Sequence, residues 1–168
     1  MKRAMLQSTT LFAAAALLTA CASSGQQEPT TDTTASGPQD TQTRAQLAVF
    51  QQLFEQGGTG ADTATRCVGL GSVPNLQAPS SELLSALQQD ASVAVVAASN
   101  CGAGERASYN GQPAVFYGVE ITECPTSGTC MARGGYYSGN LGAQTNLYRV
   151  EQINGEWQVS VAQLGPAS

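Results

Sequence analysis

Apolar and polar residues alternate through the second half of the chain, from Ser92 onward. The alternation is clearest in residues 114–123, where every second residue is apolar: Val115, Tyr117, Val119 and Ile121. Because successive side chains of a strand point to opposite faces, this period of two predicts a half-buried β-strand. The runs 93–96 and 131–137 predict two more strands. Gly134-Gly135 in the second of these runs allows a bulge or a sharp bend.

The C-terminal segment predicts a β-hairpin. Residues 147–153 and 156–163 are joined by Asn154-Gly155, which fits a type I′ turn because both central residues of that turn need positive φ. One face of the second run is apolar and carries Trp157, Val159 and Val161. We expect the indole of Trp157 to be shielded from water against a preceding helix. Asn110-Gly111 marks another turn earlier in the chain.

Two segments of the first half have helical spacing. The first helix is expected to begin at Thr43 and to end before Gly57-Gly58, with an apolar stripe formed by Leu47, Phe50, Leu53 and Phe54. The second is expected over Ser81–Gln89, with a buried face formed by Leu83, Leu84 and Leu87. Residues 67–71 lie between them and are too rich in glycine to be assigned to an element.

These elements predict an α+β domain in which two N-terminal helices pack on a curved antiparallel sheet of four to five strands. The terminal hairpin, Tyr148-Arg-Val followed by Asn-Gly-Glu-Trp157, resembles those of the cystatin and nuclear-transport-factor-2-like folds. The resemblance covers about twenty residues and concerns the arrangement of elements. It assigns no functional residue to this chain, and the cysteines belong to neither pattern.

The N-terminus carries an export signal. Lys2 and Arg3 precede the apolar segment 11–18, which is too short to span a bilayer. Leu18-Thr19-Ala20-Cys21 then resembles the lipobox of bacterial lipoproteins. The resemblance implies that Cys21 is acylated and becomes the first residue of the mature protein. Residues 22–42 contain nothing more apolar than alanine, so we expect a signal peptide over 1–20, a lipid-anchored disordered tether over 21–42 and one domain over 43–168.

Charge limits the partners that the mature protein can bind. Removing residues 1–20 takes away the one lysine and one arginine, which leaves five arginines against twelve acidic residues and a net charge of −7. So acidic a chain is not expected to bind nucleic acid or anionic headgroups through charge. The membrane is therefore reached through acyl chains on Cys21. In the lipoproteins that this signal resembles, an aspartate directly after the acylated cysteine favours retention in the inner membrane. Here Ala22 and Ser23 follow Cys21, so the resemblance implies the outer membrane, facing the periplasm, over the inner membrane.

Four further cysteines predict disulfides, since the number is even and the expected compartment is oxidising: Cys67, Cys101, Cys124 and Cys130. Three pairings are open, and we favour Cys124–Cys130, which closes a tight loop, with Cys67–Cys101. A metal site is the competing interpretation. The spacings lack a Cys-x-x-Cys knuckle and the chain has no histidine. We expect neither a metal nor a cofactor.

Catalytic chemistry has few candidate residues here. The chain has no histidine, and its one lysine is lost on export, so the commonest general base and the Schiff-base amine are missing. Glu120 and Glu123 are a close pair, but their odd spacing in a regular strand places them on opposite faces. Tyr109, Tyr136 and Tyr137 are candidates for lining a ligand pocket, and the concave face of the sheet is where a ligand is expected.

The sequence therefore predicts a lipid-anchored cell-envelope protein with no catalytic residues. Its expected role is that of a binding or interaction module for a protein or a small ligand that the sequence does not identify. Two alternatives remain open. One is an inhibitor of a wall-degrading or proteolytic enzyme that presents the loop 125–129. The other is a carboxylate-dependent enzyme.

Overall fold

The structure, a computed structural model, describes residues 38–57, 63–89 and 91–167. The first helix, α1 (Pro38–Gln56), begins at Pro38 and not at the expected Thr43, so residues 38–42 are helical and do not belong to the tether. Proline suits the first position of a helix because its φ is already helical and its missing N–H would have no partner there. The pattern missed this turn because it contains no large apolar residue.

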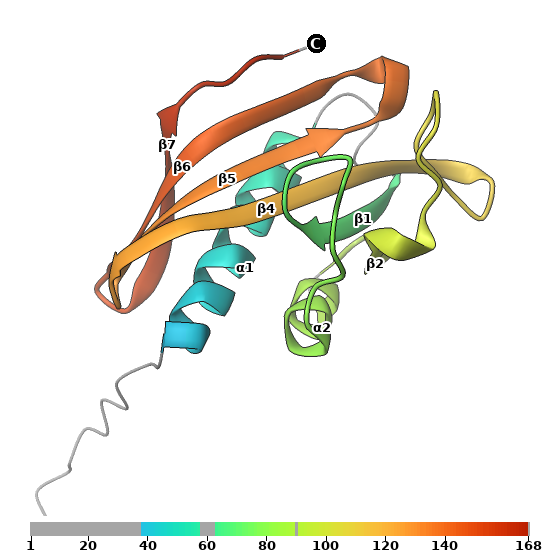
Figure 1. Ribbon diagram of the computed structural model, residues 1–168. Coiled ribbons are helices and arrows are strands. Elements are labelled where there is room, and N and C mark those ends of the chain that lie inside the picture. The colour runs from blue at the N-terminus through green and yellow to red at the C-terminus, as the bar shows by residue number, and fades with distance from the viewer. Residues whose placement is uncertain (1–37, 58–62, 90, 168) are drawn as a thin grey trace, which may run out of the picture. The chain divides into compact units, whose positions relative to one another are not determined.

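The domain is α+β, as predicted, but its sheet is mixed and larger than expected. Of its seven strands, six lie in the order β2-β1-β4-β5-β6-β7 (Figure 1), and the seventh, β3, pairs with β4. The helices and strands that follow α1 are β1 (Thr65–Leu70), α2 (Ser81–Gln89), β2 (Val95–Ala97), the 3₁₀ turn 98–100, β3 (Ser108–Tyr109), β4 (Gln112–Thr126), β5 (Thr129–Tyr137), the 3₁₀ turn 139–141, β6 (Ala143–Ile153) and β7 (Glu156–Gln163).

Strand β1, which the sequence left unassigned, makes the sheet mixed because it pairs in parallel with both β2 and β4. Helix α2 is the crossover between β1 and β2, so the two helices are not consecutive at the N-terminus. Ser80 caps α2 by accepting a hydrogen bond of 3.1 Å from the backbone N–H of Leu83. Gly69 leaves space for the following loop, because a Cβ there would lie 2.6 Å from Cβ of Leu76.

Apolar side chains form a large core on the helix-covered face of the sheet and a small one on the other face. The large core contains Val49, Phe50 and Leu53 of α1 together with Tyr117, Val119 and Tyr148 of the sheet. The small core contains Cys67, Ala98, Ala107, Ala114 and Phe116. Strand β4 is therefore buried on both faces from Ala114 to Val119, and not half-buried as its alternation suggested.

Both predicted Asn-Gly turns are present. Asn110 and Asn154 have φ of 49° and 54°, and the glycine after each also has positive φ. The second turn fixes the predicted register of the last hairpin, in which Ile153 lies opposite Glu156. Trp157 packs against the large core, but its ring is half-buried where full shielding was expected. The expected irregularity at Gly134-Gly135 is absent, and the β4–β5 register shifts after Ile121 instead.

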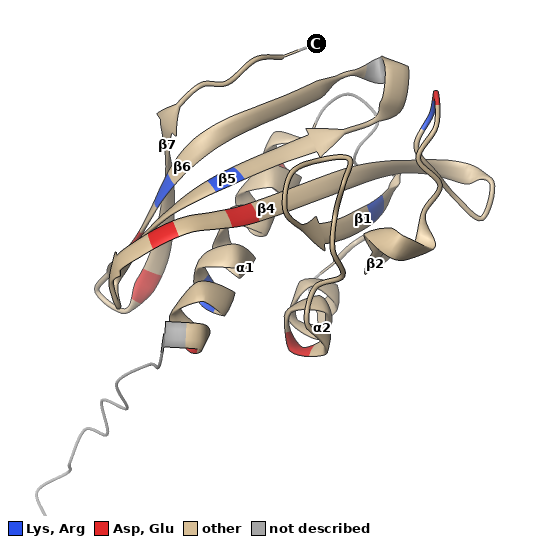
Figure 2. Ribbon diagram, in the orientation of Figure 1, with Lys and Arg blue, Asp and Glu red and all other residues tan. Residues whose placement is uncertain are grey.

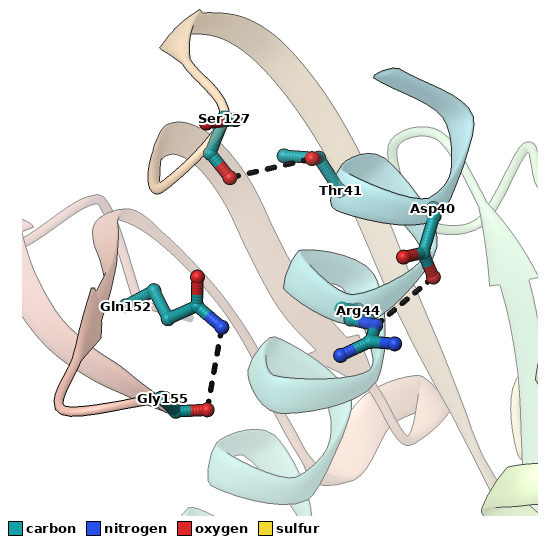
Figure 3. Close-up of polar contacts among 6 residues, drawn as sticks. All are labelled: Asp40, Thr41, Arg44, Ser127, Gln152 and Gly155. Atoms are coloured by element: carbon teal, nitrogen blue, oxygen red, sulfur yellow. Dashed lines mark hydrogen bonds and ion pairs between the residues drawn. The ribbon is translucent and has the colours of Figure 1, made fainter. Parts of the chain in front are cut away.

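The start of α1 lies beside the tips of two hairpins (Figure 3). The hydroxyl of Thr41 donates a hydrogen bond of 3.3 Å to the carbonyl oxygen of Ser127 in the β4–β5 turn. The backbone N–H of Gln152, next to the β6–β7 turn, donates to the carbonyl oxygen of Gly128 at 2.8 Å. The first turn of α1, the β4–β5 hairpin turn and the β6–β7 hairpin turn therefore lie together at one end of the domain.

Candidate functional site

The disulfides are Cys67–Cys101 and Cys124–Cys130, which is the pairing favoured from the sequence. The first joins β1 to the segment after β2 within the small core. The second crosses the β4–β5 hairpin just before its exposed tip, residues 125–127. All four cysteines among the described residues are thus paired in disulfides. Cys21, the expected lipidation site, lies outside the described residues.

The helix-covered face of the sheet has no room for a ligand beneath α1, so a ligand on the concave face stays a prediction for the part of the sheet that α1 leaves open. Apolar side chains of α1 fill the covered part. The three tyrosines do not line one pocket either: Tyr136 packs on the large core, whereas Tyr109 and Tyr137 pack on the small one. The Tyr137 hydroxyl donates a hydrogen bond of 3.2 Å to the carbonyl oxygen of Gly104.

Glu120 and Glu123 lie on the same face of the sheet, contrary to the sequence-based expectation. Glu120 is opposite Arg133 and Glu123 is opposite Met131, and these two partners are two residues apart on β5. Thr122 is the extra residue of a β-bulge, which changes the parity of the strand. The two carboxylates therefore share the face that is not covered by helices. Neither contributes to the grooves described below.

A groove crosses this helix-free face and has a volume of about 300 Å³. We call it the outer groove. Its floor is formed by Arg133 of β5 and by Thr145 and Leu147 of β6, and its wall by the C-terminal segment 163–166. Arg133 and Thr145 also line a separate hollow of about 10 Å³, together with Ser72 and Val73 of the β1–α2 loop. The β1–α2 loop and the C-terminal segment thus both border the central strands.

The outer groove combines one cation with an apolar wall. Among the described residues, Arg133 is exposed and has no carboxylate within 4.0 Å. Glu120 lies opposite it on β4, and Figure 2 shows a basic position on β5 beside an acidic position on β4. Leu147 lies opposite Arg133 on β6 and is half-buried, and Leu164 is 71% exposed. A guanidinium beside exposed leucine fits a ligand that has a carboxylate or phosphate and an apolar body.

The neighbouring arginine of this face is already paired. Arg149 Nη2 lies 2.8 Å from Glu151 Oε1 on the same strand. Its hydrogen bond to Glu151 lowers the pKa of that carboxyl, and the same contact raises the pKa of Arg149. Both side chains are exposed, so water screens the pair. Of the two described arginines that β5 and β6 place on this face, Arg133 is thus the one without a carboxylate partner.

A buried polar chain fixes the wall of the outer groove. Tyr148 donates to Gln56 Oε1 at 2.8 Å and accepts from Asn146 Nδ2 at 3.2 Å. Asn146 Oδ1 in turn accepts from the backbone N–H of Gly165 at 3.1 Å. Gln144 and Ala167 form a further antiparallel bridge. The C-terminal segment is therefore connected to α1 through β6.

A second and larger hollow, the helix cleft, lies between the first turns of α1 and the start of α2 and has a volume of about 640 Å³. Its lining is mostly polar and comprises Gln39, Asp40, Gln42, Thr43, Gln46, Leu70, Ser80 and Glu82. Asp40 is already paired with Arg44 at 2.9 Å (Figure 3). Despite its size, this cleft has no cation or aromatic ring among its described lining residues, so the outer groove is the better candidate site.

Sequence reasoning missed the outer groove because its residues come from three separate segments. Arg133 stands next to Gly134-Gly135, and Leu164 is an isolated apolar residue near the C-terminus. No local pattern brings them together. Neither helix of the described residues is both long and apolar enough to cross a membrane. The chain matches no protein-family model, no curated protein and no solved structure.

Proposed function

We propose that the protein is a lipid-anchored binding module of the bacterial cell envelope, without catalytic activity, and that the outer groove is its binding site. The observation that carries this proposal is the exposed Arg133 guanidinium beside Leu147 and Leu164. The acyl chains on Cys21 attach the protein to the outer membrane, on its periplasmic side. The partner is a protein or a small ligand that presents an anionic group beside an apolar surface.

The residues available for chemistry favour binding over catalysis. The mature chain has no histidine or lysine, and Glu120 and Glu123 do not line the outer groove. The groove instead contains the permanently charged Arg133, the side chains of Thr145 and Asn146 on β6, and an apolar wall. Such a set orients a ligand but supplies no nucleophile with an adjacent base.

Photo-crosslinking in intact cells tests this proposal. A photoreactive residue at Leu147, inside the groove, is expected to give an adduct that Arg133→Gln abolishes or strongly reduces. The same photoreactive residue at Met131 is the matched control, because Met131 lies on the same face of the sheet but outside the groove. An adduct at Met131 that equals the one at Leu147, or a Leu147 adduct that Arg133→Gln leaves unchanged, would place the binding site elsewhere.

The inhibitor alternative has one specific observation in its favour. The tip of the β4–β5 hairpin is exposed, and Cys124–Cys130, Thr41 and Gln152 hold it in place. Inhibitory loops gain affinity from such rigidity because little conformational freedom is lost on binding. Replacing Pro125 and Thr126 with alanine would abolish partner binding under this alternative and would leave it unchanged if the outer groove is the site.

A further inference from the structure

Strand β7 ends the sheet and offers an exposed edge that is regular over its first six residues. Among the described residues it pairs with β6 alone, and six of its eight residues are exposed (Figure 1). Exposed edges are usually protected by lysine, proline, inward-pointing charges or a bulge. Strand β7 has no lysine or proline, and its one charge is Glu156 at its first residue. Its pairing with β6 is regular from Glu156 to Val161, and a bulge at Ala162 follows only at its C-terminal end.

The turn geometry defines which backbone groups face outward from this edge. Ile153 and Glu156 flank the two-residue Asn-Gly turn and so form a hydrogen-bonded pair. Because such pairs alternate along an antiparallel ladder, the N–H and C=O groups of Trp157, Val159 and Val161 point away from β6. Gln152 agrees with this assignment: it lies opposite Trp157, and its N–H donates to Gly128 on the β5 side.

We propose that this edge binds β7 of a second copy of the chain in antiparallel register, with the two-fold axis at Val159. In this register Val159 lies opposite Val159 of the second copy, and Trp157 lies opposite Val161 of the second copy. These are the residues with outward-facing backbone groups, so each pair exchanges two hydrogen bonds. The sheets of the two copies become one continuous sheet.

The side chains of β7 match in the same register. Trp157, Val159 and Val161 share the core-facing side, so apolar residues meet apolar residues across the axis. Val161 is 42% exposed in one copy, and the ring of Trp157 from the second copy would cover it. On the opposite face, Gln158 lies opposite Ser160 of the second copy. An unrelated peptide would have no reason to repeat this pattern, which favours a second copy as the occupant.

Charge is compatible with this pairing. The mature chain is acidic, so two copies repel each other at long range. At the edge itself, however, Glu156 lies near the bulge at Ala162 of the second copy, and no two like charges meet. The other edge of the sheet, β2, has three residues and offers a much shorter ladder.

The oligomeric state of the full-length acylated protein in detergent tests this proposal. Sedimentation velocity should give twice the protein mass of one copy. Val161→Pro removes an outward N–H without removing a hydrogen bond to β6, so it should give the mass of one copy. Val161→Thr keeps the N–H and the branched shape, so it should remain a dimer. A wild-type protein with the mass of one copy, or a dimeric Val161→Pro, overturns the proposal.

Cysteine cross-linking tests the register and does not depend on the proline variant folding. In the Val159→Cys variant, the new cysteines of the two copies face each other across the two-fold axis. Their spacing is one that a disulfide can bridge, so the variant should give a covalent dimer. Gln158→Cys is the control, because it is more exposed but faces Ser160 of the second copy. Cross-linking of Gln158→Cys that equals or exceeds that of Val159→Cys would show random collision or pairing by a different strand, and would overturn the proposal.

Discussion

The hydroxyl of Tyr148 donates a hydrogen bond of 2.8 Å to Oε1 of Gln56, which joins the middle of β6 to the last turn of α1. Tyr148 is fully buried, and Asn146 connects it to the C-terminal segment. The wall of the outer groove therefore depends on a tyrosine on the other face of the sheet. This coupling between a core residue and a surface groove can be tested by mutation.

Tyr148→Phe should lower the free energy of unfolding by about 1–2 kcal/mol, because the side chains of Gln56 and Asn146 lose their buried partner. Urea unfolding measures this loss. Tyr136→Phe is the control, since Tyr136 is only partly buried. The structure also predicts faster proteolysis of the C-terminal segment in Tyr148→Phe. Unchanged stability and unchanged proteolysis would show that the polar chain is not formed.

The pKa of Tyr148 gives stability a specific dependence on pH. Burial raises this pKa above its ordinary value of 10.0, and the hydrogen bond from Asn146 opposes the shift. At a pH above about 10 the unfolded chain releases this proton before the folded protein does. The contribution of the protonated Tyr148 to the free energy of unfolding is therefore present below about pH 10. It is lost as the pH rises through the pKa that Tyr148 has in the folded protein. Tyr148→Phe should flatten the alkaline fall in stability, and an equally steep fall in the variant would exclude this origin.

Trp157→Ala should lower the free energy of unfolding by about 2 kcal/mol. This is less than the ~3–5 kcal/mol of a fully buried ring, because Trp157 is half-buried. Gln158→Ala, on the exposed face, should change it by about 0.5 kcal/mol or less. Nε1 of Trp157 is buried without a hydrogen-bond partner among the described residues, so Trp157→Phe should cost less than Trp157→Ala. Equal urea midpoints for the alanine variants would contradict the register of β7.

The two disulfides should contribute unequally to stability. By loop-closure entropy, Cys124–Cys130 contributes about 2.4 kcal/mol and Cys67–Cys101 about 3.8 kcal/mol. Removing Cys67–Cys101 by paired serine substitutions should therefore shift the urea midpoint further than removing Cys124–Cys130. Cys67 is also fully buried, which adds to the cost. A larger effect for the hairpin disulfide would mean that the hairpin tip stabilises the domain through more than its loop.

The sequence predicted elements well where the pattern was local. The bounds of α2 and the register of the last hairpin agree with the structure because the leucine spacing and the Asn-Gly turn specify them. Strand β1 was missed because Gly69, which leaves space for the loop above it, also lowers strand propensity. The bulge at Thr122 has no local signal, so the shared face of Glu120 and Glu123 was predicted wrongly.

The outer groove could not be predicted from the sequence, for a different reason. Arg133, Leu147 and Leu164 come together only through the β5–β6–β7 pairing and the path of the C-terminal segment. An arginine or a leucine at any one of these positions does not by itself indicate a binding site. The composition does show that the chain has no histidine and one lysine, which limits the side chains available for acid–base chemistry.

The proposed location of this protein, at the outer membrane of the cell envelope, depends on its attachment to the membrane through Cys21. Mass spectrometry of the mature protein from a bacterial host tests this most directly. We predict an N-terminal peptide that begins at Cys21 and carries a diacylglycerol and an amide-linked acyl chain, and we predict that Cys21→Ser leaves the precursor unprocessed. A wild-type protein with an unmodified N-terminus, or one that begins at another residue, would contradict the lipid-anchored assignment.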